Sequence, residues 1–169
     1  MTTNLSISEA DYRATLSFYP SGVCVITSLL PDGTPVGMSI SSFTSVSLQP
    51  PLVGFFPGSH SVTSAKIKEA GRFCANVLSA EQEALCRRFA TQSPNKFDGV
   101  DFHISYNGLP ILAGAIASIE CTVESVTSAG DHDFVLGRVV ALDTDNVKHP
   151  LVFFRSGYGQ FQAAATCGA

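Results

Sequence analysis

Residues 23–56, VCVITSLLPDGTPVGMSISSFTSVSLQPPLVGFF, decide the fold class, because they contain several strand-like runs joined by turns. Residues 23–27 are rich in β-branched side chains, and residues 31–34 have the Pro, Asp and Gly that are typical of a turn. Residues 36–41 are therefore predicted to return as the partner strand of a β-hairpin.

Two more strands are expected inside the same stretch. Residues 43–48 alternate apolar and polar side chains, which is the pattern of a strand with one buried face. After Pro50 and Pro51, residues 52–56 are apolar and indicate a buried strand. The two prolines are expected to fix how the first of these strands leads into the second.

Three helices are expected elsewhere, over residues 9–18, 61–69 and about 79–90. Ser8, followed by Asp11 three residues later, has the pattern of an N-cap for the first helix. Gly71 is the expected end of the second helix, and Ser79 with Gln82 has the pattern of a capping box that opens the third.

The rest of the chain adds further strands, expected over residues 73–78, 116–126, 134–142 and 151–154. In the strand over 116–126, alternation places Glu120, Thr122 and Glu124 toward solvent and Ile119, Cys121 and Val123 toward the core. Residues 93–114 are expected to form a long irregular segment. Sequential strands joined by short turns, with few helical crossovers, predict a mainly β fold: an antiparallel barrel with peripheral helices.

The composition limits the classes of protein to consider. At 169 residues and 45% hydrophobic residues, the chain is expected to form one domain over residues 1–169. Because only 14% of the residues are charged, part of the apolar surface is expected to be buried in a homo-oligomer. The net charge of -4, with basic residues interleaved with acidic ones, argues against nucleic-acid binding.

The sequence also indicates a compartment. No apolar run approaches the ~20 residues of a membrane helix, and the first residues lack a hydrophobic signal region, so a cytoplasmic protein with no membrane partner is expected. The cysteines are odd in number and show no C-x-x-C spacing, which argues against a zinc site or a disulfide framework. They are Cys24, Cys74, Cys86, Cys121 and Cys167.

Common catalytic motifs are missing from the chain. It has no G-x-G-x-x-G, no G-x-x-x-x-G-K-[ST], no G-x-S-x-G and no H-E-x-x-H. Residues 37–47 are instead unusual, since six of these eleven side chains are hydroxylic and none is charged. Hydrogen-bonding groups beside apolar surface suit a planar heterocycle such as an isoalloxazine, and an ordinary Ser- and Thr-rich strand pair is the alternative.

Two other segments are candidates for binding. Residues 59–64 carry several hydroxyl groups where a strand gives way to a helix N-terminus, which suits a phosphate, and simple N-capping is the alternative. His132 lies in the turn over residues 129–133, between two predicted strands. It is expected either at a barrel rim within reach of a ligand or as a solvated turn residue.

Several motifs together resemble one known family. They occupy, in order, residues 21–27, 37–53, 71–78, 88–90, 96–100 and 130–132. This ordered set is similar to the short-chain flavin reductase family, the reductase components of two-component flavin-dependent monooxygenases. The resemblance covers residues 16–158, which are taken as the core of the domain.

The resemblance implies an FMN-binding split β-barrel, a homodimer, and reduction of FMN or FAD by NADH or NADPH. It also implies a separate monooxygenase that receives the reduced flavin. One departure is the bulky pair Phe55 and Phe56 before Pro57 and Gly58, where smaller residues are expected. This pair leaves the choice between FMN and FAD open.

The resemblance further implies a set of site residues. The isoalloxazine and ribityl chain are expected at Met38, Ser39, Ile40, Ser41, Ser42, Thr44 and Ser45. The phosphate region is expected at Ser59 and Ser61, and the outer part of the flavin at Lys96 and Phe97. The nicotinamide nucleotide is expected at the catalytic residue His132, with Phe18, Pro20, Ser21, Arg155 and Tyr158.

Two alternatives stay open at this point. One is another split-barrel flavoprotein, similar to pyridoxamine-phosphate oxidase, which is expected to show a basic phosphate-binding cluster; the chain has no such cluster between Arg13 and Lys66. The other is a flavin-binding module without enzymatic activity, which would bind a flavin that NADH does not reduce.

Overall fold

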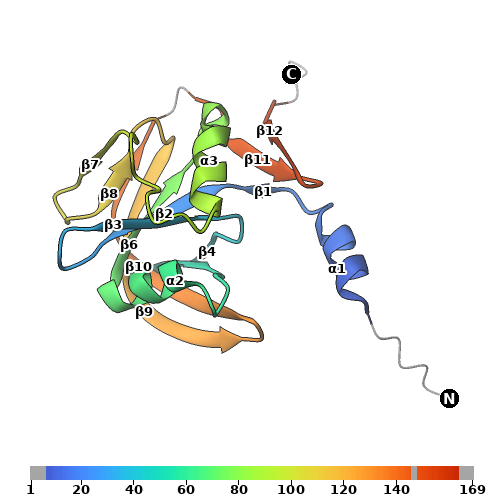
Figure 1. Ribbon diagram of the computed structural model, residues 1–169, viewed down its shortest axis with the longest axis horizontal. Helices are drawn as coiled ribbons and strands as arrows, with labels where there is room; N and C mark the ends of the chain where they lie inside the picture. The colour runs from blue at the N-terminus through green and yellow to red at the C-terminus, as the bar shows by residue number, and fades with distance from the viewer. Residues whose placement is uncertain (1–6, 146–147, 164–169) are drawn as a thin grey trace.

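The computed structural model describes residues 7–145 and 148–163, so Cys167 lies outside the described residues. Its centre is a seven-stranded antiparallel sheet in the order β3-β2-β6-β9-β10-β5-β4, with helices at the periphery (Figure 1). The strands are β2 (Cys24–Leu29), β3 (Pro35–Ile40), β4 (Thr44–Leu48), β5 (Pro51–Phe55), β6 (Arg72–Val77), β9 (Ala117–Ala129) and β10 (His132–Thr144). The predicted mainly β, antiparallel architecture is confirmed.

Two small sheets and three α-helices complete the described fold. The sheets are β1-β11-β12 and β7-β8, with bounds β1 (Ser21–Gly22), β11 (Leu151–Phe154), β12 (Gly157–Gln160), β7 (Phe102–Ile104) and β8 (Pro110–Leu112). The helices are α1 (Glu9–Leu16), α2 (Val62–Ala70) and α3 (Glu83–Ala90), the last preceded by a short 3-10 helix (Ala80–Gln82). None of the helices in this part of the chain is long and apolar enough to span a membrane.

The predicted hairpins are found where the sequence places them, and so are the predicted start of the first helix and the end of the second. β2 pairs with β3 and β4 with β5, so residues 23–56 supply two hairpins, one at each edge of the seven-stranded sheet. Ser8 Oγ accepts a hydrogen bond from the backbone N–H of Asp11 (3.0 Å) at the start of α1. Gly71 ends α2 with a φ of 68°, a left-handed conformation that glycine adopts without steric cost. Helix α1 ends at Leu16, two residues earlier than expected.

The prediction for residues 93–114 is wrong in part, because this segment contains the hairpin β7–β8. The hairpin makes polar contacts with the outer face of the large sheet. Thr27 Oγ1 donates to the carbonyl of Pro110 (2.5 Å), and the backbone N–H of Leu112 donates to Asn76 Oδ1 (2.8 Å). Strands β1 and β12 were also not predicted, since each is only a few residues long.

The same hairpin overturns the prediction that Glu120 faces solvent. Glu120 is 6% exposed, and it accepts a hydrogen bond of 2.6 Å from Ser105 Oγ. Alternation along β9 does place Glu120 on the face opposite Cys121, but this face is covered by the segment around β7 and β8 instead of by water. The burial of a carboxylate is tolerated because it is hydrogen-bonded.

The inner face of the sheet holds the hydrophobic core. Phe55 and Phe73 pack edge to face there, with ring centroids 5.1 Å apart. Gly137 on β10 lets the Phe73 ring approach the backbone, since a Cβ at this position would lie 2.5 Å from the end of the ring. The four described cysteines are buried, and burial raises the pKa of Cys24, Cys74 and Cys121 to about 12, so these thiols act as small apolar side chains.

Candidate functional site

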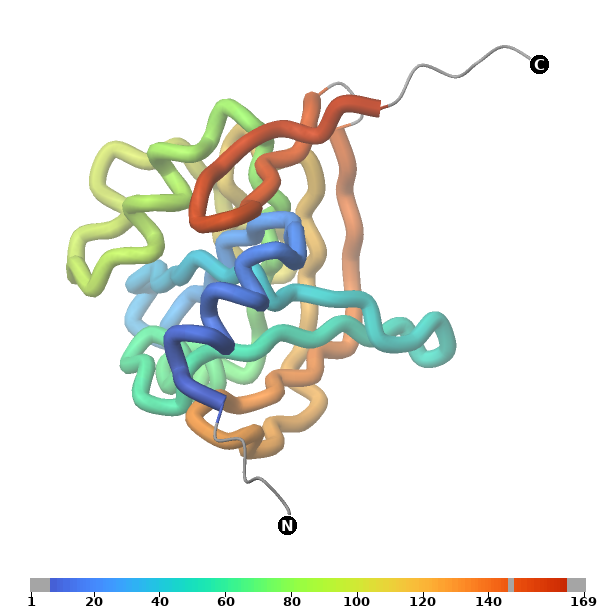
Figure 2. Tube along the Cα trace, turned by 90° about the vertical axis from the view of Figure 1, so that its right-hand side faces the viewer, coloured from blue at the N-terminus to red at the C-terminus, as the bar shows by residue number. Residues whose placement is uncertain are grey.

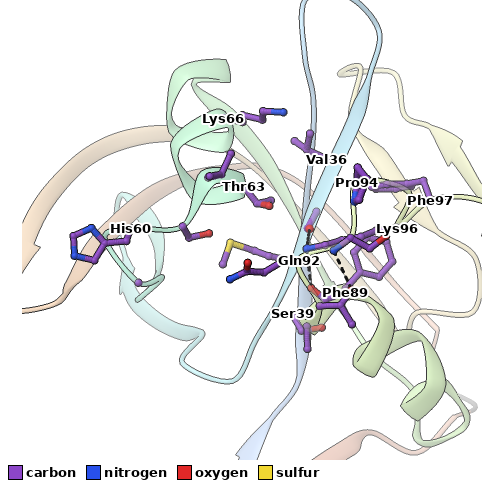
Figure 3. A pocket seen from close by; sticks show the side chains of 18 of the residues that line it. Val36, Ser39, His60, Thr63, Lys66, Phe89, Gln92, Pro94, Lys96 and Phe97 are labelled. Atoms are coloured by element: carbon purple, nitrogen blue, oxygen red, sulfur yellow. Dashed lines mark hydrogen bonds between the residues drawn. The ribbon is translucent and has the colours of Figure 1, made fainter.

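A cavity of about 760 Å³ lies between strand β3, the start of helix α2 and the segment that follows helix α3 (Figure 3). We call it the main cavity. Its volume falls within the range of small-molecule sites. The predicted residues Met38, Ser39, Ser61, Lys96 and Phe97 line it, and His132 stands at its edge on the hairpin β9–β10.

A second depression of about 530 Å³, which we call the side groove, adjoins the main cavity. The two share Met38, Ser39, Gly58, Asp131 and His132. The side groove continues along the predicted residues Ile40, Ser41 and Ser42. Two ligands bound in the main cavity and the side groove would therefore meet beside β3 and His132.

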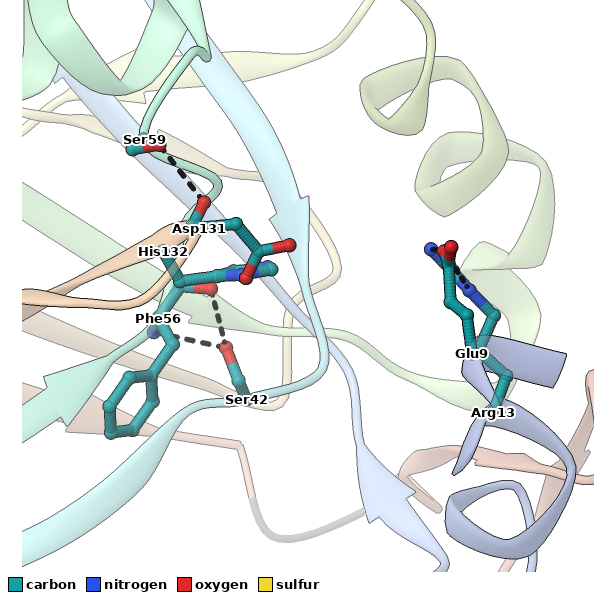
Figure 4. A network of polar contacts seen from close by, with 7 residues as sticks. All are labelled: Glu9, Arg13, Ser42, Phe56, Ser59, Asp131 and His132. Atoms are coloured by element: carbon teal, nitrogen blue, oxygen red, sulfur yellow. Dashed lines mark hydrogen bonds and ion pairs between the residues drawn. The ribbon is translucent and has the colours of Figure 1, made fainter. Parts of the chain in front are cut away.

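Hydroxyl groups at the end of β3 hold this wall in place. Ser39 Oγ donates to the carbonyl of Cys86 (2.6 Å) and so attaches β3 to helix α3. Ser42 Oγ accepts from the backbone N–H of Phe56 (3.0 Å) and donates to its carbonyl (3.2 Å), as Figure 4 shows. Part of the hydroxyl-rich pattern thus serves to fix the backbone around the side groove.

The N-terminus of helix α2 opens into the main cavity. Ser61 is the N-cap, and its Oγ accepts a hydrogen bond from the backbone N–H of Ser64 (3.2 Å). Val62, Thr63 and Lys66 line the cavity from the first turns of the same helix. The positive end of the helix dipole and the ammonium group of Lys66 give this end of the cavity a preference for an anion.

Lys96 carries a positive charge into the wall of the main cavity. The residue is 8% exposed, and its Nζ donates to the backbone carbonyls of Gly37 and Phe89 (3.2 Å each; Figure 3). Among the residues that the structure describes, no carboxylate forms an ion pair with Lys96. Burial lowers the pKa of Lys96, because the charged ammonium loses solvation. An anionic ligand in the cavity would compensate for this lost solvation.

His132 lies at the rim, where the main cavity and the side groove meet. Its Nδ1 is 2.8 Å from Asp131 Oδ1, and 48% of the side chain is exposed. Ser59, expected near a phosphate, instead bonds this turn: its backbone N–H and its Oγ both donate to the carbonyl of Asp131 (3.0 Å each; Figure 4). The hydrogen bond to His132 lowers the pKa of Asp131, so this carboxylate is charged and holds the imidazole.

Eight of the predicted site residues line neither the main cavity nor the side groove, and Ser59 is one of them. Thr44 and Ser45 lie at the start of the exposed strand β4. Phe18, Pro20, Ser21, Arg155 and Tyr158 gather around β1 and the turn between β11 and β12. There the backbone N–H of Arg155 donates to the carbonyl of Ser17 (2.8 Å), and the Arg155 guanidinium lies 4.8 Å from the Phe18 ring centroid.

Tyr158, one of these residues near β1 and the β11–β12 turn, contacts helix α3. Cys86 Sγ donates to the Tyr158 hydroxyl (3.3 Å), and the Arg87 guanidinium lies 4.8 Å from the centroid of its ring. Burial and the hydrogen bond with Cys86 raise the pKa of Tyr158 to about 12. The phenol is therefore protonated at neutral pH.

Several residues of the site were not predicted. Tyr12 reaches the side groove from helix α1, and His60, Lys66, Phe89 and Gln92 line the main cavity. The spacing of Val62 and Lys66 on a predicted helix was a usable signal, since residues four apart share a face. No comparable signal existed for Tyr12, because the sequence does not say where α1 lies against the barrel. Within the described ranges, no group of three His, Cys, Asp or Glu side chains is placed to hold a metal ion.

Comparisons with known proteins agree on one family. Residues 16–162 match the family model described as flavin reductase like domain. A flavin reductase of Pseudomonas putida is 48% identical over 152 residues, which cover 90% of this chain and 89% of the relative. The reductase subunit of a flavin-dependent monooxygenase from Rhodococcus jostii (strain RHA1) is 42% identical over 153 residues, or 90% of this chain and 78% of the relative.

A solved structure of a flavin-reducing enzyme has a fold similar to that of this chain. The NADH:FAD oxidoreductase of Streptomyces globisporus C-1027, in complex with NAD and FAD fragments, has a TM-score of 0.88 and 33% sequence identity to this chain. The match covers 94% of this chain and 95% of that structure. The predicted split-barrel fold class is confirmed by this likeness.

Proposed function

The chain belongs to the family of flavin reductase-like domains, and on this premise we propose that it passes a hydride from NADH to FMN or FAD in the main cavity and side groove. It is a flavin reductase that supplies reduced flavin to a separate monooxygenase. NADH is the proposed donor because a similar protein of known structure is an NADH:FAD oxidoreductase. The observation that carries the proposal is the meeting of the two depressions beside Met38, Ser39 and His132.

The side chains around the two depressions fit a flavin. Met38 and Phe89 offer apolar surface for a planar ring, and residues 40–42 offer backbone and hydroxyl groups for its polar edge. Lys96 is buried without a carboxylate partner in the described part of the chain, which suits the phosphate of a flavin nucleotide. The N-terminus of α2 lies in the same cavity and suits the same group.

The residues of the site can be assigned to separate roles in hydride transfer. A bound flavin supplies the hydride acceptor, so no side chain of the protein has to act as a nucleophile. Residues 38–42 would hold the ring, while Lys96 and the amides at the start of α2 would hold the phosphate. His132, fixed by Asp131, would position the nicotinamide and transfers no proton. The family match removes the pyridoxamine-phosphate-oxidase-like alternative.

NADH oxidation is expected to require added flavin, because the site offers hydrogen bonds and charge but no covalent anchor. Protein stripped of flavin should show background NADH oxidation, and FMN or FAD should restore turnover in a steady-state absorbance assay. The same assay without protein is the control. Turnover by the stripped protein, or a covalent flavin in its mass spectrum, would contradict a freely exchanging flavin.

We also propose that the chain is one domain throughout and works as a homodimer in the cytoplasm. Helix α1 has no buried residue although it carries Tyr12 and Leu16, and Leu48 on the β4–β5 hairpin is 91% exposed. Figure 2 shows this hairpin extending away from the barrel. A helix of eight residues is not stable in isolation, so a second copy is the proposed cover for these surfaces.

Light scattering is expected to give about twice the 17.8 kDa mass of the chain at micromolar concentration. Replacing Leu48 with aspartate should shift the protein toward the monomer, because it places a charge on an apolar interface. Lys148→Asp, a charge change at an exposed position outside these surfaces, is the control. A wild-type monomer at this concentration would refute the dimer.

A further inference from the structure

We propose that the partly buried ion pair between Lys68 and Asp133 is a positioning pair, which holds His132 in the place where it meets the nicotinamide. Lys68 Nζ lies 2.6 Å from Asp133 Oδ2, and the two side chains are 23% and 11% exposed. Lys68 belongs to the last turn of helix α2, and Asp133 is the second residue of strand β10. The inference rests on the proposed function, since it concerns the residue that contacts NADH.

The pair differs from the other Lys and Arg ion pairs in the described part of the chain. Arg13–Glu9 and Arg87–Glu83 join neighbouring turns of one helix, and Arg138–Glu124 joins the two strands of one hairpin. All six of those side chains are at least 38% exposed. Lys68 and Asp133 are 65 residues apart and are shielded from water, so their contact fixes two separate elements relative to each other.

Strand geometry connects Asp133 to His132. Successive side chains of a strand point to opposite faces, so Asp133 points inward while His132 points to the rim. Anchoring the Asp133 side chain therefore fixes the backbone from which the imidazole projects. Among the residues that the structure describes, Asp131 alone forms a hydrogen bond with the His132 side chain, and that bond is exposed.

Backbone contacts also join the start of strand β10 to the segment that precedes helix α2. The N–H of Asp133 donates to the carbonyl of Pro57 (3.0 Å), and Gly58 forms an isolated bridge with His132. Residues 57–59 lead directly into α2, whose last turn returns to Asp133 through Lys68. The phosphate end of the main cavity and the histidine at its rim therefore belong to one rigid unit.

A buried ion pair is a weak source of stability, because the desolvation of both charges offsets their attraction. The Lys68–Asp133 pair does restrict geometry, since a charged hydrogen bond of this length allows little displacement of either side chain. Positioning thus explains the burial better than stabilisation does. The pair acts on the NADH step through His132 and contacts neither NADH nor flavin.

The test is a double-mutant cycle between Asp133→Asn and His132→Ala, measured by anaerobic mixing of flavin-loaded protein with NADH. Asp133→Asn alone should slow flavin reduction or raise the KM for NADH by about 3- to 10-fold, with flavin affinity unchanged within about twofold. In the His132→Ala background it should have almost no further effect. Lys68→Met should reproduce the loss, and Lys68→Arg should retain most of the activity. Glu124→Gln, which breaks an exposed pair of the same hairpin, is the matched control and should be silent.

Several results would contradict a positioning role for the Lys68–Asp133 pair. Fully multiplicative losses in the double variant, an unchanged rate in Asp133→Asn, or an equal loss of flavin affinity would each overturn the proposal. Circular dichroism melting of all variants shows whether they fold, and failure of both Asp133→Asn and Lys68→Met to fold would make the pair a stability element instead. A wild-type protein that does not reduce flavin would refute the proposed function and not this pair.

Discussion

Replacement of His132 by alanine is expected to slow flavin reduction by NADH by about 10- to 100-fold, or to raise the KM for NADH by the same factor. The reason is geometric. His132 stands where the main cavity meets the side groove, and its Nδ1 is held by Asp131 at 2.8 Å. Loss of the ring would leave the nicotinamide less well placed, while the flavin would keep residues 38–42 and Lys96.

Anaerobic stopped-flow mixing and a separate flavin titration distinguish these two effects. His103→Ala, at an exposed position of strand β7 outside both depressions, is the control and should behave as wild type. If His132→Ala abolished flavin binding and left NADH kinetics intact in the residual holoprotein, the turn would belong to the flavin site and the assignment would be wrong.

Replacement of Lys96 by methionine is expected to weaken FMN binding by about 10- to 100-fold. The ammonium group lies in the wall of the main cavity with two carbonyl partners and, within the described residues, no carboxylate. A phosphate is the partner that this charge is expected to take. Fluorescence titration of the stripped protein with FMN gives the dissociation constant.

Riboflavin, which lacks the phosphate, provides the control for Lys96→Met. Its affinity should change little, so the ratio of FMN to riboflavin affinity should fall in the variant. Because burial lowers the pKa of Lys96, FMN affinity of the wild type should fall as rising pH removes the proton, at a pH below that of an ordinary lysine. Lys96→Met should lose this dependence. Equal losses for FMN and riboflavin would make Lys96 a structural residue.

The fold was largely predictable because strands and caps are local. The runs that form β2 to β5, the Ser8 and Ser61 caps and the αL glycine Gly71 all follow from short-range sequence patterns. The hairpin β7–β8 was missed because each strand has three residues and depends on partners far away, such as Asn76. Alternation gave the side of β9 to which Glu120 points but not what covers that side.

The site was predictable only where a motif marked it. Met38 to Ser42, Ser61, Lys96, Phe97 and His132 were assigned by resemblance, and these residues line the two depressions. Tyr12 and Phe89 could not be assigned, because their place depends on how helices α1 and α3 pack against the barrel. The contact between Lys68 and Asp133 likewise joins residues that no local pattern connects.

Anaerobic mixing of the wild-type protein with FMN or FAD and excess NADH tests the central claim most directly. A reductase should bleach the visible absorbance of the flavin at a rate that requires the protein and saturates with NADH concentration. The spectrum should return when oxygen is admitted. Flavin that binds the protein but keeps its absorbance with both NADH and NADPH would contradict the account and identify a binding module.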